Sequence, residues 1–128
     1  MTEETKLVFQ QLNNALKRLE EVAALPLSPQ KYEIDLTIHR FEFTFELFWK
    51  ALRKKLIDEY GVNVNSPKPV LQEAYLNQLI EREETWIAML QDRNLTSHTY
   101  KEALAFEIYN NIKIYTPFLR ESLNKLLK

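Results

Sequence analysis

The sequence predicts an all-α fold, an up-and-down bundle of about four to five helices around one core. Three observations lead to this prediction. Apolar residues recur three and four positions apart in long segments, which is the spacing of one helix face. The 128 residues include a single glycine, which disfavours the tight hairpins of a β-sheet protein. Hydrophobic residues make up 45% of the chain, enough for the core of one domain covering residues 1–128.

The first two predicted helices cover about residues 3–24 and 30–60, with prolines between them. Ser28 followed by Pro29 indicates an N-cap with proline at the first helical position. The second helix is apolar on more than one side, so it lies at the centre of the bundle or packs against a second chain. Gly61 follows it, where a left-handed residue favours glycine. The main stripe of the second helix consists of Ile34, Ile38, Phe41, Phe45, Phe48, Leu52 and Leu56.

The sequence pattern of the second half of the chain predicts three further helices. One begins near Ser66, where Ser-Pro-Lys-Pro is a helix-start signal, and the next begins near Glu83. The last covers about residues 101–127. Pro117 falls inside it, removes one hydrogen bond and clashes with the carbonyl of Lys113. We therefore expect a kinked C-terminal helix, with two separate helices as the alternative.

Composition excludes several classes of function. The chain has no cysteine and therefore no disulfide, thiolate nucleophile or cysteine-ligated metal. One glycine is too few for the glycine-rich phosphate loops of Rossmann and P-loop proteins. The net charge is −1, so any nucleic-acid contact would use a local patch. No apolar stretch approaches the ~20 residues that span a bilayer, and no signal peptide is visible. We expect a cytoplasmic protein without membrane contact.

The two histidines are candidates for chemistry. His39 lies close in sequence to Asp35 and Glu42, on adjacent parts of one helix face. A two-metal site in a bundle, however, needs Glu-x-x-His on two helices, and the sequence lacks such a pair. We interpret His39 as an ordinary histidine and predict no metal and no cofactor. His98 lies five residues after Arg93, which on an unbroken helix would place the two side chains on different faces.

The segment that contains Arg93 and His98 favours a break in the helix, and Thr99 with Glu102 indicates a capping box. A break would let Arg93 and His98 converge, while Asp92 would pair with or orient a nearby cation. The plainer alternative is that Arg93 caps carbonyls at a helix end and His98 starts the next helix. The residues that favour the break by competing for backbone hydrogen bonds are Asn94, Thr96, Ser97 and Thr99.

A basic cluster occurs in the second predicted helix. Its four side chains indicate either an extension of an RNA-binding surface or an ordinary solvated helix face. The cluster consists of Lys50, Arg53, Lys54 and Lys55.

The motif around Arg93 resembles that of the HEPN superfamily. That motif is an arginine, a polar residue such as Asn94, three variable residues and a histidine, here His98. Tyr100 extends it to the Arg-x4-His-x-Tyr form of HepT-type proteins. Residues 39–50 are similar to the second helix of nucleotidyltransferase substrate-binding proteins. The resemblance covers nearly the whole chain and includes, in the same order, Ser66, Pro67 and Trp86.

The resemblance implies a HEPN-like homodimer whose two motifs face each other across the interface. It implies a metal-independent endoribonuclease, the toxin of a toxin–antitoxin pair. A cognate minimal nucleotidyltransferase would silence it by transferring AMP to Tyr100. Arg93 would hold the RNA phosphate and His98 would transfer protons, because histidine gains and loses a proton near neutral pH. Asn94 would orient His98 or contact the phosphate.

Two alternative functions remain open at the level of sequence. The first is a non-catalytic substrate-binding subunit of a two-component nucleotidyltransferase, which retains the motif for its interface or as an AMP acceptor. The second is a purely structural bundle. A neighbouring gene for a nucleotidyltransferase would disfavour the structural bundle. Only an activity assay separates the ribonuclease from the substrate-binding subunit.

Overall fold

The structure, a computed structural model, describes residues 1–128 and is all-helical, as predicted. The elements begin and end within a few residues of the predicted segments. None of the helices combines the length and hydrophobicity that a membrane span requires. The elements are α1 (Glu3–Ala23), α2 (Tyr32–Tyr60), α3 (Pro67–Leu76), α4 (Glu83–Leu95), a one-turn 3₁₀ helix η1 (Thr96–His98) and α5 (Glu102–Leu126).

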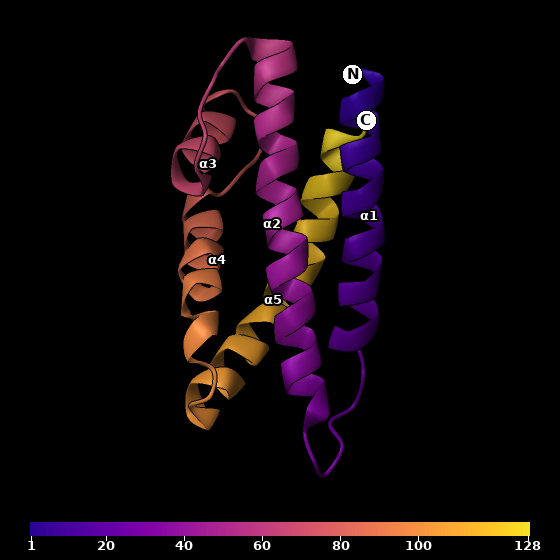
Figure 1. Ribbon diagram of the computed structural model, residues 1–128, viewed down its shortest axis with the longest axis vertical. Coiled ribbons are helices and arrows are strands. Elements are labelled where there is room, and N and C mark those ends of the chain that lie inside the picture. The colour runs from indigo at the N-terminus through magenta and orange to yellow at the C-terminus, as the bar shows by residue number, and fades with distance from the viewer.

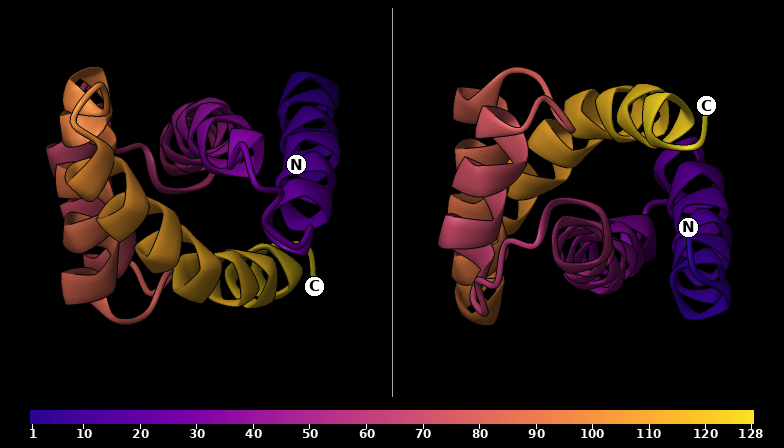
Figure 2. Two further views of the ribbon diagram at one scale, coloured as in Figure 1. Left: turned by 90° about the horizontal axis from the view of Figure 1, so that it is seen from below. Right: turned by 90° about the horizontal axis from the view of Figure 1, so that it is seen from above.

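The long helices run up and down, with α2 at the centre (Figure 1). Helices α1 and α2 form an antiparallel pair, while α3 and α4 follow each other along the opposite side of α2. Helix α5 returns diagonally behind α2, so the helices enclose a common core (Figure 2). Both termini lie at one end of the bundle. The α1–α2 loop and the α4–α5 turn lie at the other end.

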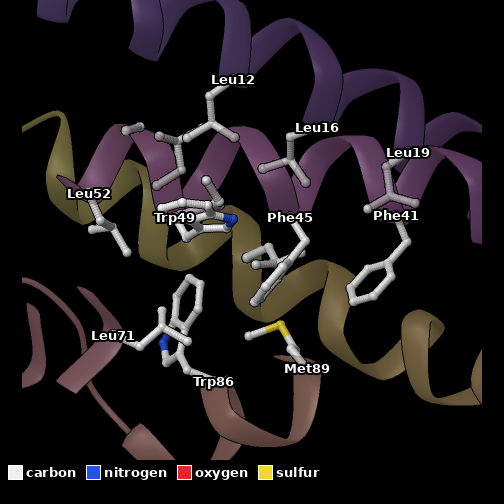
Figure 3. Packing of buried hydrophobic residues seen from close by; sticks show 14 of the residues in the cluster. Leu12, Leu16, Leu19, Phe41, Phe45, Trp49, Leu52, Leu71, Trp86 and Met89 are labelled. Carbon is white, nitrogen blue, oxygen red and sulfur yellow. The ribbon is translucent and has the colours of Figure 1, made fainter. Parts of the chain in front are cut away.

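Helix α2 supplies the centre of the core, which confirms one of its two predicted positions. It contacts α1, α3, α4 and α5. Its aromatic residues lie between leucines of α1 and the side chains of α4 (Figure 3). The Phe48 and Trp86 rings meet edge to face, with centroids 4.8 Å apart, a favoured aromatic geometry. The large side chains with essentially no exposed surface include Phe9, Phe41, Phe45, Phe48, Leu52, Trp86 and Met89.

The two ends of α2 show how far local signals determine helix boundaries. Gly61 ends the helix in the left-handed conformation, with φ of 64°, as predicted. The predicted N-cap at Ser28 is wrong, because α2 begins at Tyr32 after Lys31. The backbone N–H and the hydroxyl of Ser28 both donate to the Glu33 carboxylate, at 2.7 and 2.9 Å. Glu33 therefore binds the residue that was expected to cap the helix.

Helix α5 continues through Pro117 as one element, which excludes the alternative of two separate helices. Its axis changes direction along its length, as both views of Figure 2 show. The Thr116 hydroxyl donates to the Ile112 carbonyl at 2.7 Å, next to the hydrogen bond that proline cannot make. The bend lets α5 follow the core from α4 to α1.

Asp92 joins the end of α4 to α5. Its Oδ2 accepts hydrogen bonds from the Tyr115 hydroxyl at 2.6 Å and the Asn111 side-chain amide at 3.1 Å. The expectation that Asp92 pairs with a cation is therefore wrong, because two neutral donors on α5 occupy it. Burial, followed by the hydrogen bond and charge of Asp92, raises the pKa of the Tyr115 hydroxyl above its ordinary value.

The contribution of the core is testable on two isoleucines of α5. Ile112 is fully buried and Ile114 is 73% exposed, because positions two apart point to opposite sides of a helix. Replacing Ile112 with Ala should lower the free energy of unfolding by about 2–5 kcal/mol, through lost burial and a cavity. Ile114→Ala should change it by less than about 0.5 kcal/mol. Urea unfolding measures both, and equal losses would contradict this packing.

The Asp92–Tyr115 hydrogen bond is testable by Tyr115→Phe. Asp92 then loses a donor, so the free energy of unfolding at pH 7 should fall by about 1.5–3 kcal/mol. Because the pKa of Tyr115 is higher in the folded state than in the unfolded state, its contribution to stability is complete below the unfolded pKa of tyrosine, near 10. Above that pH the contribution decreases. The loss should therefore shrink as the pH rises beyond about 10. Urea unfolding across this range is the measurement. Tyr32→Phe is the control, since Tyr32 is 65% exposed, and an equal loss there would contradict the assignment.

Candidate functional site

The predicted break between Arg93 and His98 is confirmed. Helix α4 ends at Leu95, the 3₁₀ turn ends at His98, and α5 begins at Glu102. The Thr96 hydroxyl donates to the Arg93 carbonyl at 2.7 Å, and the Thr99 hydroxyl donates to the Thr96 carbonyl at 2.8 Å. These hydroxyls bind carbonyls that a continuing helix would have used.

The predicted capping box of Thr99 and Glu102 is wrong. The residue that precedes α5 is Lys101, and no side chain caps the helix. The Thr99 hydroxyl is directed back to the 3₁₀ turn, where it binds the Thr96 carbonyl. Thr99 therefore ends one element instead of starting the next.

Arg93 extends from α4 toward the middle of α2. Its Nη1 lies 3.8 Å from Oε2 of Glu42, and its Nη2 lies 3.6 Å from Oε1 of Glu46. Nη1 also donates to the Thr96 hydroxyl at 3.4 Å, whereas the buried Nε has no partner. Arg93 donates to no backbone carbonyl, so it does not cap the end of α4. Its guanidinium keeps donors for a further acceptor.

Glu42 and Glu46 are the site residues that sequence reasoning did not assign. They lie four positions apart on α2, so they share one helix face. Glu46 also accepts a hydrogen bond from the indole N–H of Trp49 at 3.2 Å and lies 3.7 Å from Nζ of Lys50. Partly exposed ion pairs stabilise a fold by only about 0–1 kcal/mol. The main effect of the two carboxylates is to orient Arg93.

The other three motif residues face solvent. Asn94, His98 and Tyr100 are all exposed, with Tyr100 at 75%. The rings of His98 and Tyr100 lie edge to face, with centroids 6.2 Å apart. His98 makes no hydrogen bond with Arg93, so the expected convergence does not occur as a contact within one chain. The chain thus presents an imidazole ring beside a phenol ring, and an arginine that turns toward α2.

A shallow hollow of about 410 Å³ lies over Arg93 and the outer face of α2. Phe43 is 55% exposed here, which is unusual for a phenylalanine on the central helix of a bundle. His39 also borders the hollow and is exposed. The hollow is lined by His39, Glu42, Phe43, Glu46, Leu47, Lys50 and Arg93.

The basic cluster of α2 forms local pairs. Lys54 lies 2.8 Å from Glu4, and Lys55 lies 2.6 Å from Glu59. Arg53 donates to the Asn65 side chain at 2.9 Å. Because its cations are paired within the chain, the cluster is better described as a solvated helix face than as an RNA-binding surface.

Comparisons with known proteins agree with this arrangement. The family model described as nucleotidyltransferase substrate binding protein like matches residues 7–128. A curated relative, a probable ribonuclease HepT of Haemophilus influenzae, is 34% identical over 95 residues, which are 69% of this chain. The match spans 65% of that relative, slightly under two thirds of its length.

A crystal structure of a Thermus thermophilus protein has the same fold, with a TM-score of 0.84 and 38% sequence identity. It matches 91% of this chain and 99% of that one. The resemblance predicted from the motif is therefore confirmed at the level of the family. The chain belongs to the HepT-like family of nucleotidyltransferase substrate-binding proteins.

Proposed function

We propose that this protein is a metal-independent endoribonuclease, the toxin of a HepT-like toxin–antitoxin pair. The observation that carries the proposal is the exposed break between α4 and α5, where Asn94, His98 and Tyr100 face solvent beside Arg93. The similarity to a probable ribonuclease HepT supports it. RNA is the substrate, and no cofactor takes part.

Arg93 supplies the positive charge. Its planar fork of donors matches the oxygens of a phosphate, and it stabilises the charge that develops on the phosphorus oxygens. Glu42 and Glu46 contact the Arg93 guanidinium from one side, and both ion pairs are long, with N–O distances above 3.5 Å. A phosphate with shorter hydrogen bonds can therefore compete for the same donors. Asn94 contacts the backbone phosphate or orients His98.

His98 transfers the protons. A general base takes the proton of the RNA 2′-hydroxyl, and the 2′-oxygen attacks the adjacent phosphorus. The bond from phosphorus to the 5′-oxygen breaks, and a general acid protonates that leaving oxygen. The products are a 2′,3′-cyclic phosphate and a free 5′-hydroxyl. One imidazole cannot serve as base and acid in the same concerted step, so we assign the two roles to two histidines.

A homodimer supplies the second histidine. We place the contact at the outer face of α2, where Phe43 is exposed next to the hollow over Arg93. An exposed aromatic ring surrounded by polar residues is a typical interface centre. Pairing two copies there brings the two motifs into one cleft. Arg93 of one protomer and His98 of its partner then act on the same phosphate.

Regulation follows from Tyr100. A cognate minimal nucleotidyltransferase transfers AMP from a nucleoside triphosphate to the phenol oxygen, and pyrophosphate leaves. The 75% exposure of Tyr100 makes the oxygen accessible to such an enzyme. The added nucleotide places bulk and negative charge beside His98, which excludes RNA by sterics and repulsion.

The second candidate function is a substrate-binding subunit without catalysis. The description of the family model favours it, since it names substrate binding for a nucleotidyltransferase. In that role the motif serves the interface and presents Tyr100. The two functions differ in whether the isolated protein cleaves RNA.

The ribonuclease is testable with the purified, unmodified protein, mixed RNA and a chelator. The wild type should cleave the RNA, and His98→Ala should lose about 10²- to 10⁴-fold in rate, the usual contribution of a general acid or base. Tyr75→Ala is the control, because Tyr75 is an exposed ring on α3 that lies outside the motif and outside the hollow over Arg93. No activity in the wild type would favour the substrate-binding subunit, and full activity in His98→Ala would contradict the role of His98.

The dimer is testable by analytical ultracentrifugation. The wild type should sediment at twice the chain mass. Phe43→Glu should sediment as a monomer, because it buries an unpaired charge in the interface. Ile114→Glu is the control, since Ile114 is exposed on α5, away from the proposed contact. A dimer that persists in Phe43→Glu would contradict this choice of interface.

A further inference from the structure

A second hollow, of about 370 Å³, lies beside Tyr100 and is separate from the one over Arg93. It is formed where the α1–α2 loop and the start of α2 meet the α4–α5 turn and the start of α5. These segments lie at the end of the bundle opposite the termini (Figure 1). Its size falls in the range of about 300–1,000 Å³ that small-molecule sites occupy.

The floor of this hollow is apolar and includes an aromatic ring. Ile34 and Ala105 are buried beneath it, and Phe106 is 38% exposed at its side. Phe106 therefore offers a ring face or edge to a planar ligand. Base stacking on an aromatic side chain contributes about 1–3 kcal/mol and requires no particular sequence.

The rim carries charges of both signs. Lys31, Asp35 and Glu102 line the hollow, and Nζ of Lys31 lies 5.9 Å from the centroid of Phe106. Lys101 does not line the hollow, but its Nζ lies 6.0 Å from the centroid of Tyr100, which does. None of these four charged side chains forms an ion pair, unlike the lysines of the basic cluster on α2.

Two helices begin at this hollow without a side-chain cap. Lys31 precedes α2 and Lys101 precedes α5, and in neither helix does the N-cap side chain accept a hydrogen bond from the first backbone N–H groups. The first N–H groups of a helix lack partners within it and favour negative charge. Together with the lysines, they suit one phosphate group. The carboxylates of Asp35 and Glu102 suit hydrogen-bond donors, such as ribose hydroxyls and an amino group on a base.

We propose that this hollow binds AMP, the group that Tyr100 carries in the silenced state. The inference rests on the proposed function, because it takes Tyr100 as the acceptor. The adenine stacks on Phe106, the phosphate lies near Lys31 and Lys101, and the carboxylates accept from the sugar or base. A bare phosphate or the RNA backbone fits less well, since both would meet the carboxylates without offering them enough donors.

Docking changes what the modification does. A group tethered to Tyr100 is present at an effective concentration in the millimolar range, so a dissociation constant of about 1 mM is enough to hold it. A docked AMP stays in one place beside His98 and also occupies the two lysines. The silenced state is then an ordered structure.

The test is an NMR titration of the unmodified, ¹⁵N-labelled full chain with AMP. Backbone amides of residues 30–35 and 99–106 should shift, with a dissociation constant of about 1 mM. Inorganic phosphate at equal concentration should shift them less. Phe106→Ala should weaken AMP binding about fivefold or more, through lost stacking. Ile114→Ala, another exposed apolar residue of α5, should bind as the wild type does.

Three results would overturn the proposal: no shifts in these segments at about 10 mM AMP, equal shifts with inorganic phosphate, or no effect of Phe106→Ala. This titration requires neither RNA cleavage nor AMP transfer, so its failure is distinct from failure of the proposed function. A second arm uses protein whose transfer of AMP to Tyr100 is verified by mass spectrometry. In this protein the tethered AMP should already occupy the hollow, so free AMP should no longer shift the same amides. An unchanged response would overturn docking of the tethered group.

Discussion

The interaction on which the site depends is the one between Asp92 and α5. The Tyr115 hydroxyl and the Asn111 amide both bind the Asp92 carboxylate, so the last turn of α4 is fixed against α5. The chain must reverse direction immediately afterwards, between Leu95 and Glu102. With both sides of that reversal held together, the turn projects the exposed motif residues from a rigid base. Sites on such supported elements keep their geometry better than sites on free loops.

Helix α2 serves the core and the site with different faces. Phe41, Phe45 and Phe48 point inward and are fully buried. Glu42 and Glu46 lie on the outer side, where they meet Arg93. Because one rigid helix carries both sets, the packing that stabilises the bundle also determines where Arg93 is held.

Helical periodicity predicted the helices and their order, because the 3.6-residue repeat is a local property of the sequence. Gly61 and the break after Arg93 were predictable for the same reason. The helix N-caps could not be predicted, because Ser28 and Thr99 each form a hydrogen bond with a competing partner nearby. The hydrogen bond of Asp92 to Tyr115 and the ion pair of Glu46 with Arg93 could not be predicted, because each joins two helices and depends on how those helices pack. The motif residues came from resemblance to a family, which periodicity alone could not supply.

Within one chain Arg93 and His98 are not in contact, so the central claim is that the cleavage centre is completed by a second copy. The most direct measurement is subunit mixing. Wild-type chains would be mixed with an excess of His98→Ala chains under conditions of subunit exchange and assayed for RNA cleavage. The cleavage rate per wild-type chain should fall toward that of His98→Ala, because a mixed dimer keeps only one of the two histidines that act as base and acid. An unchanged rate per wild-type chain would contradict the shared site.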